Sequence, residues 1–244
     1  MRNVFHYGTI GSTNEIALIL AARGLEHFTV ITAKEQTAGR GRRGAEWISP
    51  PGSNLYCSVI VKPNTPYKPD RIPELTFVAS TAIARALRDF GVQCSIKWPN
   101  DILARGRKIS GILIESVNNG AAAVIGIGVN VNCTEFPAEL SNKATSIAIE
   151  TGNSVDVEKC LDQVLVRLEE ALQLHEKGFD LTLKEWISLE NTTGMEVKTV
   201  HNDEEVKGVA LGIDEKGGLL VQLASGEVIT VTAAGALIED QEEQ

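Results

Sequence analysis

The spacing of apolar residues predicts alternating strands and helices up to about residue 191. Residues 54–62 carry apolar side chains at every second position, which is the pattern of a half-buried strand. Residues 73–90 have the helical period, begin with a proline and stop before a glycine. The same criteria predict the other elements of this part: strands at 28–33, 93–98, 108–117 and 121–131, and helices at 16–22, 157–176 and 181–190.

Beyond residue 191 the pattern changes to short strands separated by tight turns. Four strands are predicted, at 195–200, 205–213, 218–223 and 227–231. Several short strands within about fifty residues are typical of a small barrel. We therefore predict an α+β protein with two domains: a mixed β-sheet with packed helices over residues 1–191, and a small β-barrel over residues 192–244. The acidic stretch 239–243 is expected to be solvated.

The composition narrows the class of protein. With 43% hydrophobic and 23% charged residues, the 244-residue chain can bury a globular core. It has no apolar stretch long enough to span a bilayer and no secretory signal, so we expect a cytoplasmic protein without a membrane partner. The formal net charge of −9 argues against a DNA-binding surface, because binding to phosphates requires positive charge.

The cysteines indicate neither a metal site nor a disulfide framework. No two of them have the spacing of a metal-binding pair, and no histidine accompanies them at ligand spacing. We expect all four to be buried free thiols: Cys57, Cys94, Cys133 and Cys160.

Against the acidic background stands a basic segment, Gly-Arg-Gly-Arg-Arg-Gly at residues 39–44, here called the glycine-arginine loop. It matches the dinucleotide fingerprint GxGxxG, but that fingerprint requires a helix that opens on its last glycine. Pro50 and Pro51 follow too soon for such a helix. An anion site is favoured over a solvated basic loop, because guanidinium groups pair with carboxylates and phosphates, and glycines allow close approach to a ligand.

Three further segments contain candidate chemistry, and each has a structural alternative. In 97–101, Lys-Trp-Pro-Asn-Asp, a lysine ends a strand, but the Asn-Asp pair could simply form a turn and the tryptophan could lie in the core. In 126–132, glycines alternate with asparagines in a strand, which suits either a ligand or packing under a turn. Ser12 and Glu15 have the spacing of a capping box, and a helix cap is the favoured interpretation.

In their order along the chain, these segments resemble the catalytic domain of the biotin protein ligases. The glycine-arginine loop and segment 97–101 are highly specific to that family. The resemblance also covers the C-terminal part, which is similar to the family's small SH3-like β domain, notably at Gly212-Ile213-Asp214. It implies the class II synthetase-like fold for the first domain, and it extends over nearly the whole chain.

The resemblance implies a two-step ligase reaction. The carboxylate of biotin attacks the α-phosphate of ATP and forms biotinyl-5′-adenylate, with Mg²⁺ assisting. A lysine of a biotin carboxyl carrier protein, such as a subunit of acetyl-CoA carboxylase, then accepts the biotinyl group. A homodimer is plausible by the same resemblance. Because Ser12 comes so early in the sequence, we expect no N-terminal DNA-binding domain, and no DNA as partner.

Carried over by position, the resemblance implies the following site residues. The catalytic residues are Lys97, Arg40 and Arg42. The biotin site comprises Ser12, Thr13, Asn14, Gln36, Gly39, Arg40, Gly41, Arg42, Lys97 and Gly111. The nucleotide site comprises Arg42, Arg43, Gly44, Trp47, Lys97, Asn100, Lys108 and Asn130. The residue expected to help to hold Mg²⁺ is Asp101.

Other functions remain open at this point. A lipoate-type ligase or acyltransferase has the same fold but is disfavoured by the glycine-arginine loop. A sensor that binds biotin or a nucleotide without catalysis is suggested only by Ala45-Glu46, where family members often carry another basic residue. A DNA-binding repressor is disfavoured by the net charge.

Overall fold

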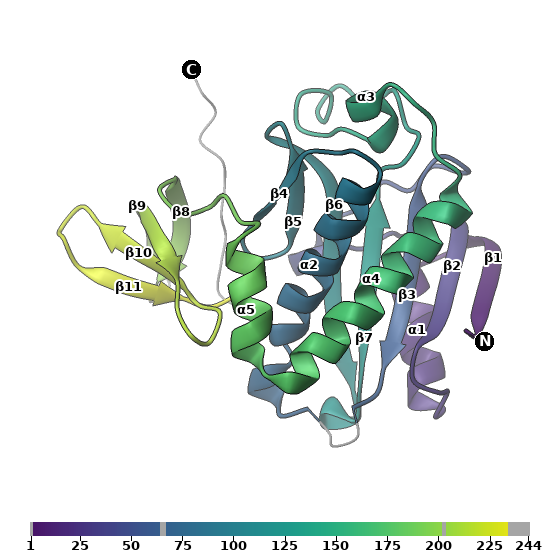
Figure 1. Cartoon of the computed structure of the whole chain (residues 1–244), viewed down its shortest axis with the longest axis horizontal. Helices are drawn as coiled ribbons and strands as arrows, with labels where there is room; N and C mark the ends of the chain where they lie inside the picture. The colour runs from purple at the N-terminus through teal and green to yellow at the C-terminus, as the bar shows by residue number, and fades with distance from the viewer. Residues whose placement is uncertain (1, 64–66, 202–203, 234–244) are drawn as a thin grey trace.

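A seven-stranded mixed β-sheet organises the larger part of the protein in this computed structural model, which describes residues 2–63, 67–201 and 204–233 (Figure 1). The strand order is β1-β2-β3-β7-β6-β5-β4. Strands β1 and β2 are parallel, and the other neighbours are antiparallel. The strands are β1 (Val4–Ile10), β2 (Thr29–Gln36), β3 (Leu55–Val61), β4 (Cys94–Lys97), β5 (Asp101–Ala104), β6 (Arg107–Val117) and β7 (Ala122–Val129).

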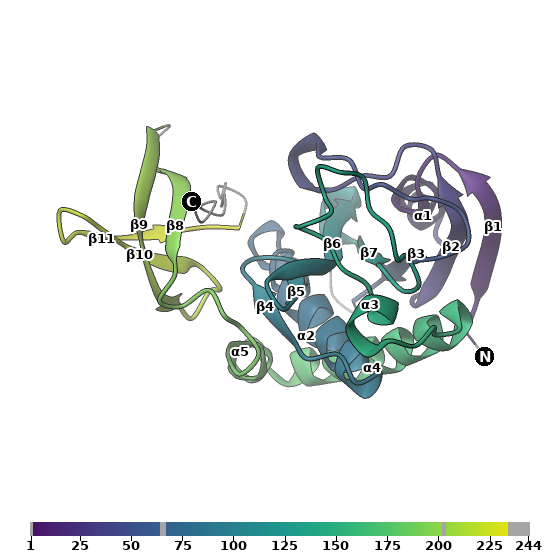
Figure 2. The same ribbon diagram turned by 90° about the horizontal axis from the view of Figure 1, so that it is seen from above.

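Helices cover the two faces of this sheet unequally. Three of them, α2 (Glu74–Asp89), α4 (Val157–Lys177) and α5 (Phe179–Ile187), lie on one side (Figure 2). On the other side, α1 (Thr13–Ala22) packs mainly against β3 and β7 and also contacts β2 and β6. The short helix α3 (Ile147–Thr151) lies at one end of the sheet (Figure 1).

Strand β3 is buried on both faces, so the prediction of a half-buried strand was wrong. All seven of its residues are buried. Ile60 packs with Ala17 of α1, whereas Val59 belongs to the main core on the opposite face. The alternation in the sequence is real, but its second face carries Ser58 and Tyr56, which are buried polar residues that hydrogen-bond within the protein.

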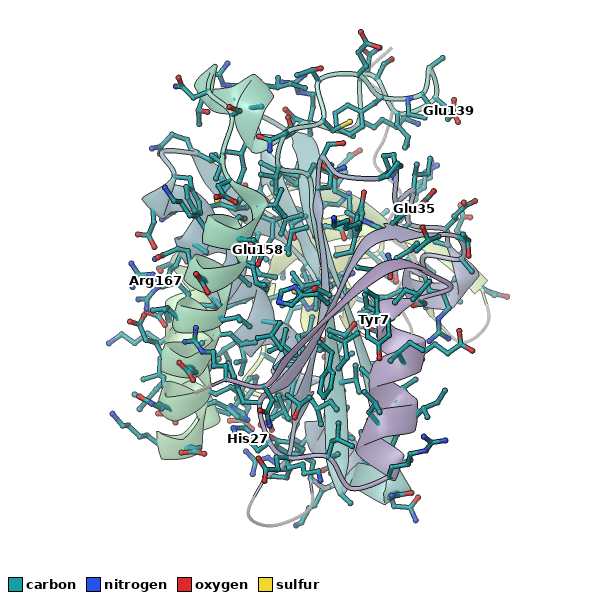
Figure 3. All side chains as sticks on the ribbon, turned by 90° about the vertical axis from the view of Figure 1, so that its right-hand side faces the viewer. Tyr7, His27, Glu35, Glu139, Glu158 and Arg167 are labelled. Carbon is teal, nitrogen blue, oxygen red and sulfur yellow. The ribbon has the colours of Figure 1, made fainter. Side chains whose placement is uncertain are left out.

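The outer edge of the sheet is formed by β1, seen in Figure 3 with Tyr7 directed toward α1. Tyr7 packs against the small apolar cluster between α1 and the sheet. On the opposite side of the sheet Arg167 projects outward from α4, whereas Glu158 lies on the side of α4 toward β1, 3.9 Å from His6 Nδ1 (Figure 3). Arg167 forms a two-pronged ion pair with Asp89, with N–O distances of 2.7 and 2.8 Å, and thereby joins α4 to α2.

The C-terminal part forms a separate four-stranded antiparallel sheet in the order β11-β10-β9-β8. Its strands are β8 (Glu196–His201), β9 (Glu204–Ile213), β10 (Leu219–Leu223) and β11 (Val228–Val231). The four predicted strands are therefore confirmed. Within the described residues the sheet is not closed by a ladder between its edge strands, so the closed barrel that we predicted is not observed.

Most predicted elements of the first domain are confirmed with small shifts at their ends. Strand β1, strand β5 and helix α3 were not predicted. The cysteines are free, as expected, but Cys133 is partly exposed and the prediction that it is buried was wrong. The acidic stretch 239–243 lies outside the described residues. Among the helices that the structure describes, none has the length and apolar character needed to cross a membrane.

Candidate active site

A cleft of about 320 Å³ lies on the α1 face of the sheet. The N-terminus of α1, the glycine-arginine loop, the β4–β5 connection and strands β6 and β7 line it. It brings together most residues that the sequence predicted for the site: Ser12, Thr13, Asn14, Gln36, Arg40, Gly41, Arg42, Arg43, Trp47, Lys97, Asn100, Asp101, Lys108 and Gly111.

The glycines of β7 make room for the cleft. Val124 packs toward α1, and in the alternation of the strand Gly126 and Gly128 occupy the next two positions on that face. A Cβ atom at position 126 would lie 2.1 Å from Asn14 Oδ1, and one at position 128 would lie 2.4 Å from the Trp47 ring. The glycines are therefore required by close contacts rather than by strand propensity.

Asn14 sits above Gly126 and reaches strands on both sides. Ser58 and Leu113 flank Gly126 in the register of β3, β7 and β6. Ser58 donates a hydrogen bond of 2.6 Å to Asn14 Oδ1, and Asn14 Nδ2 donates one of 2.8 Å to the carboxylate of Glu115. Asn14 is 4% exposed, so this arrangement fixes a buried amide at the head of the cleft.

A chain of hydrogen bonds continues from Ser58 to the other side of the cleft. Ser58 Oγ lies 2.8 Å from Thr13 Oγ1, and the Thr13 backbone N–H donates to Gln36 Oε1 over 2.8 Å. Gln36 Nε2 then donates to Ser49, which donates to the carbonyl oxygen of Trp47. We call this chain, from Glu115 through Asn14, Ser58, Thr13 and Gln36 to Ser49, the polar network.

The capping-box interpretation of Ser12 was wrong. Ser12 stands at the N-cap position of α1, but its side chain makes no cap hydrogen bond. It is buried, 3% exposed, and lines the cleft. The side chains at the start of α1 therefore line the cleft, and Ser12 does not cap the helix.

The glycine-arginine loop forms part of a hairpin-like excursion, residues 39–47, that folds over β6 and β7. Its two arms meet in the Arg40–Glu46 bridge and in the hydrogen bond from Trp47 N to Gly39 O, 3.0 Å long. Gly39 must be glycine, because a Cβ atom there would lie 2.3 Å from the Trp47 carbonyl oxygen. The next regular element is strand β3 and not a helix, which confirms that the loop is no dinucleotide fingerprint.

Trp47 closes the loop onto the sheet. Gly111 and Gly128 are paired across β6 and β7, and the Trp47 ring lies over both of them. The Trp47 indole N–H is buried and has no hydrogen-bond partner among the residues that the structure describes, and the ring lines the cleft as well as a second cavity. A buried donor without a partner costs about 1–3 kcal/mol, which a bound acceptor can recover.

Basic side chains line the remaining wall of the cleft. Arg40 pairs with Glu115 over 2.9 Å. Arg42 donates 2.9 Å to Asn100 Oδ1 and also to the carbonyl oxygen of Ala233, which links the loop to the C-terminal part. Burial lowers the pKa of the Arg42 guanidinium, and the neighbouring Arg43 lowers it further. This wall is suited to negative charge.

Lys97 and Lys108 complete the wall from the strands. Lys97 is the last residue of β4 and lines the cleft. Lys108 pairs with Asp101 over 2.7 Å and lies 5.5 Å from the centre of the Trp47 ring. Trp98 is a core residue, 1% exposed.

A second cavity of about 330 Å³ adjoins the cleft and shares Glu46, Trp47 and Lys108 with it. The segment around Phe136 and Leu140 supplies apolar lining that the sequence analysis did not single out. Asn130 also lines this cavity, but its side chain donates to the carbonyl oxygen of Thr145 over 3.0 Å. This hydrogen bond favours the structural interpretation of Asn130, in which the side chain packs under a turn, over a contact with a ligand.

Two predicted residues line neither the cleft nor the second cavity, and three residues of the polar network were not predicted. Gly39 is buried and Gly44 lies at the exposed tip of the loop, and neither lines the cleft. Ser58, Ser49 and Glu115 belong to the polar network but were not assigned a role. Only the register of β3 with β7 identifies Ser58, because its own sequence context is that of a strand interior.

Two segments of the chain match models of known protein families. A model of the biotin/lipoate A/B protein ligase family matches residues 9–132, and a model of the biotin protein ligase C-terminal domain matches residues 192–238. The chain belongs to the biotin/lipoate A/B protein ligase family.

Individual members of this family are similar over nearly the whole chain. A biotin–[acetyl-CoA-carboxylase] ligase of Paracoccus denitrificans is 34% identical over 91% of this chain and 95% of its own length. The bifunctional ligase/repressor BirA of Bacillus subtilis (strain 168) is 32% identical over 92% of this chain and 71% of its own length. The structure of biotin protein ligase from Aquifex aeolicus in complex with biotin and ATP aligns with 99% of this chain, with a TM-score of 0.84 and 29% identity.

Proposed function

We propose that the chain is an ATP-dependent biotin protein ligase. It activates biotin to biotinyl-5′-adenylate and then transfers the biotinyl group to a lysine of a biotin carboxyl carrier protein. The observation that carries the proposal is a single cleft in which the hydroxyl and amide groups of the polar network face a wall of arginines and lysines. Such a cleft matches a substrate with a neutral polar head and an anionic end.

The polar network favours biotin over lipoate. The ureido group of biotin has both N–H donors and a carbonyl acceptor, which Ser12, Thr13, Asn14 and Gln36 can satisfy. The dithiolane ring of lipoate has no such groups and cannot use the remaining hydrogen-bonding capacity of these side chains. A site built to hydrogen-bond its substrate rejects analogues that lack the partner groups, and the rejection can reach roughly 10⁴-fold.

The basic wall suits the first chemical step. The carboxylate oxygen of biotin attacks the α-phosphorus of ATP, and pyrophosphate leaves with the electron pair of the broken P–O bond. Two anions must approach one another, so Lys97, Arg40 and Arg42 act by neutralising charge that is greatest in the transition state. Holding both reactants in one cleft removes an entropic barrier that reaches roughly 7–11 kcal/mol in ideal cases.

The second step needs access for a carrier lysine. Its amine attacks the acyl carbonyl of the adenylate, and AMP leaves. The excursion at residues 39–47 folds over β6 and β7, so we expect it to cover the adenylate and to limit hydrolysis of the anhydride while the carrier approaches. We infer that the carrier is a biotin carboxyl carrier protein and that the ligase acts without a membrane or DNA partner. A homodimer would have the edge strand β1 available for pairing.

We assign the nucleotide to the junction of the two cavities, which share Glu46, Trp47 and Lys108. We assign the adenine to the second cavity, where apolar residues near Phe136 and Leu140 meet Trp47, Lys108 and Asn130. Asp101 is the carboxylate of the cleft best placed to help to hold Mg²⁺, which when bound would neutralise phosphate charge. A Mg²⁺ ion commonly takes only one or two protein carboxylates beside substrate phosphates, and the described residues contain no larger acidic cluster.

Incubation of the protein with ATP, Mg²⁺, biotin and an apo carrier domain tests the proposal. We expect biotin on the carrier lysine, with one pyrophosphate and one AMP released for each biotin transferred. A parallel reaction with lipoate in place of biotin should leave the carrier unlabelled. Labelling by lipoate alone would instead indicate a lipoate ligase, and tight binding of biotin without labelling would indicate a sensor.

A further inference from the structure

The carboxylate of Glu115 occupies an unusual position between the two halves of the cleft. It lies on β6, directly opposite Val124 of β7, and points to the face that carries the cleft. A single oxygen, Oε2, accepts hydrogen bonds from Asn14 Nδ2 at 2.8 Å and from Arg40 Nη2 at 2.9 Å. One atom therefore contacts both the start of α1 and the glycine-arginine loop.

The contact with Asn14 determines which way the amide points. Both neighbours of Nδ2, the Glu115 carboxylate and the carbonyl oxygen of Leu113, can only accept hydrogen bonds. The amide nitrogen must therefore face β6, and Oδ1 must face Ser58 on β3. Oδ1 keeps acceptor capacity for an N–H group of a ligand in the cleft. Without Glu115, a flipped amide would present a donor where an acceptor is needed.

The contact with Arg40 ties the loop to the same point. Arg40 is 44% exposed in its side chain and Glu115 is 26% exposed, so water screens the ion pair and it is weak. A weak pair can hold the loop in place and still yield to a stronger anion. The far end of the excursion is held separately, because Ser49 of the polar network donates to the Trp47 carbonyl oxygen.

We propose that Glu115 is a positioning residue that couples the two tasks of the cleft, by orienting the Asn14 amide for the ureido head of biotin and by anchoring the loop through Arg40. This inference rests on the proposed function for its biotin half only. The anchoring of the loop concerns the ligand-free protein and can be measured without any substrate.

Two substitutions separate the tasks. Glu115→Gln keeps an acceptor for Asn14 Nδ2 but loses the charge that attracts Arg40, whereas Glu115→Ala loses both. We expect the dissociation constant for biotin, measured by calorimetry, to rise about tenfold or more in the alanine variant and to stay within about threefold of wild type in the glutamine variant.

Cleavage by trypsin after Arg40, Arg42 and Arg43 reports on the loop in the absence of ligand. We expect both variants to be cut there several times faster than wild type, as followed by mass spectrometry of the peptides. Glu35→Gln is the matched control, because Glu35 lies in the same sheet on β2, separated from β6 by two strands, and its side chain bonds only to Thr9 among the described contacts. It should behave as wild type in both assays.

The possible results distinguish the two hypotheses. If wild type binds biotin and the alanine variant binds it equally well, the orienting role of Glu115 is wrong while the ligase proposal stands. If wild type does not bind biotin, the ligase proposal fails, and unchanged trypsin cleavage would then refute the anchoring role as well. Equal loss of biotin affinity in both variants would show that the charge, and not the orientation of the amide, is what matters.

Discussion

Lys97 ends β4 and lines the cleft, and its replacement is the most direct test of the basic wall. We expect Lys97→Ala to slow the release of pyrophosphate by about 10²–10³-fold, which is the usual effect of removing one donor that stabilises developing charge. The unfolding temperature should stay within a few degrees of wild type. Lys184→Ala, on the outer surface of α5, is the control and should leave the rate unchanged. A wild-type rate in the Lys97 variant would remove this lysine from the mechanism.

Gly126 is the residue on which the head of the cleft depends most closely. In Gly126→Ala the new methyl group would overlap the Asn14 amide, so Asn14 must move away from Ser58 or Glu115. We expect a loss of about 1–3 kcal/mol in stability from overpacking, and a loss of biotin affinity of about tenfold. Calorimetric titration with biotin and thermal unfolding measure the two effects.

Gly8→Ala is the matched control for this substitution. Gly8 also lies in a strand, β1, and a Cβ atom there meets nothing within 4 Å. Biotin affinity should therefore remain that of wild type. If both alanine variants bind biotin normally, the close contact between Gly126 and Asn14 does not limit the site.

At the scale of single residues, the sequence predicted which residues line the cleft better than it predicted the hydrogen bonds between them. Lys97, the arginines and the polar triplet at the start of α1 were all identified, and all line the cleft. Ser58 and Glu115 were missed, because each is defined by strand register and not by neighbours in sequence. Ser12 was interpreted as a cap because capping and ligand sites use the same side chains.

At the scale of elements, α2 and α4 are joined by a buried histidine whose charge state should affect stability. His175 of α4 is 6% exposed and lies 3.3 Å from Glu74 of α2. Burial lowers the pKa of His175, and Arg71 lowers it further, while Glu74 and Glu176 oppose these effects. The folded protein therefore favours the neutral imidazole.

A pH dependence of stability follows from this shift. The pKa is lower in the folded state than in the unfolded chain, so the unfolded chain binds the proton more readily. The contribution of His175 is present above about pH 6.5 and is lost as the pH falls through the folded-state pKa. Urea unfolding of wild type and His175→Gln at pH 7.5 and pH 5.5 should show a smaller pH effect in the variant. An equal pH effect in both proteins would contradict this.

The elements themselves were predictable where periodicity is long and were missed where it is short. Helices α2 and α4 span several turns with clear end signals, and both were predicted closely. Strand β5 has only four residues, and helix α3 has only five, so neither shows a recognisable period. Strand β1 was missed because only part of its surface is buried, and its pattern is correspondingly weak.

At the scale of the whole molecule, Trp98 joins the two sheets. Its indole N–H donates to the carbonyl oxygen of Gly217 over 3.0 Å, and its backbone N–H donates to Thr192 over 2.8 Å. We expect Trp98→Phe to lower the unfolding temperature by several degrees, because an orphaned buried carbonyl costs about 1–3 kcal/mol and each kcal/mol is worth roughly 2–4 °C at this size. Differential scanning calorimetry would measure the shift, and an unchanged temperature would mean that this contact is dispensable.

The division into two sheets was visible in the sequence, because the change from long helices to short strands is abrupt. Whether the second sheet closes into a barrel was not predictable, since closure depends on contacts between its first and last strands. The link from Arg42 to Ala233 was equally hidden, because it joins a side chain to a main-chain oxygen that no pattern marks.

The floor beneath Asn14 and Trp47 consists of bare backbone at Gly111, Gly126 and Gly128. No side chain can be shortened at these three positions, so trimming the floor gains space only at the neighbouring Leu113. Any further space for a bulkier acid must come from α1 or from the excursion at residues 39–47. Both also carry recognition or charge, so wider substrate scope should come with slower activation.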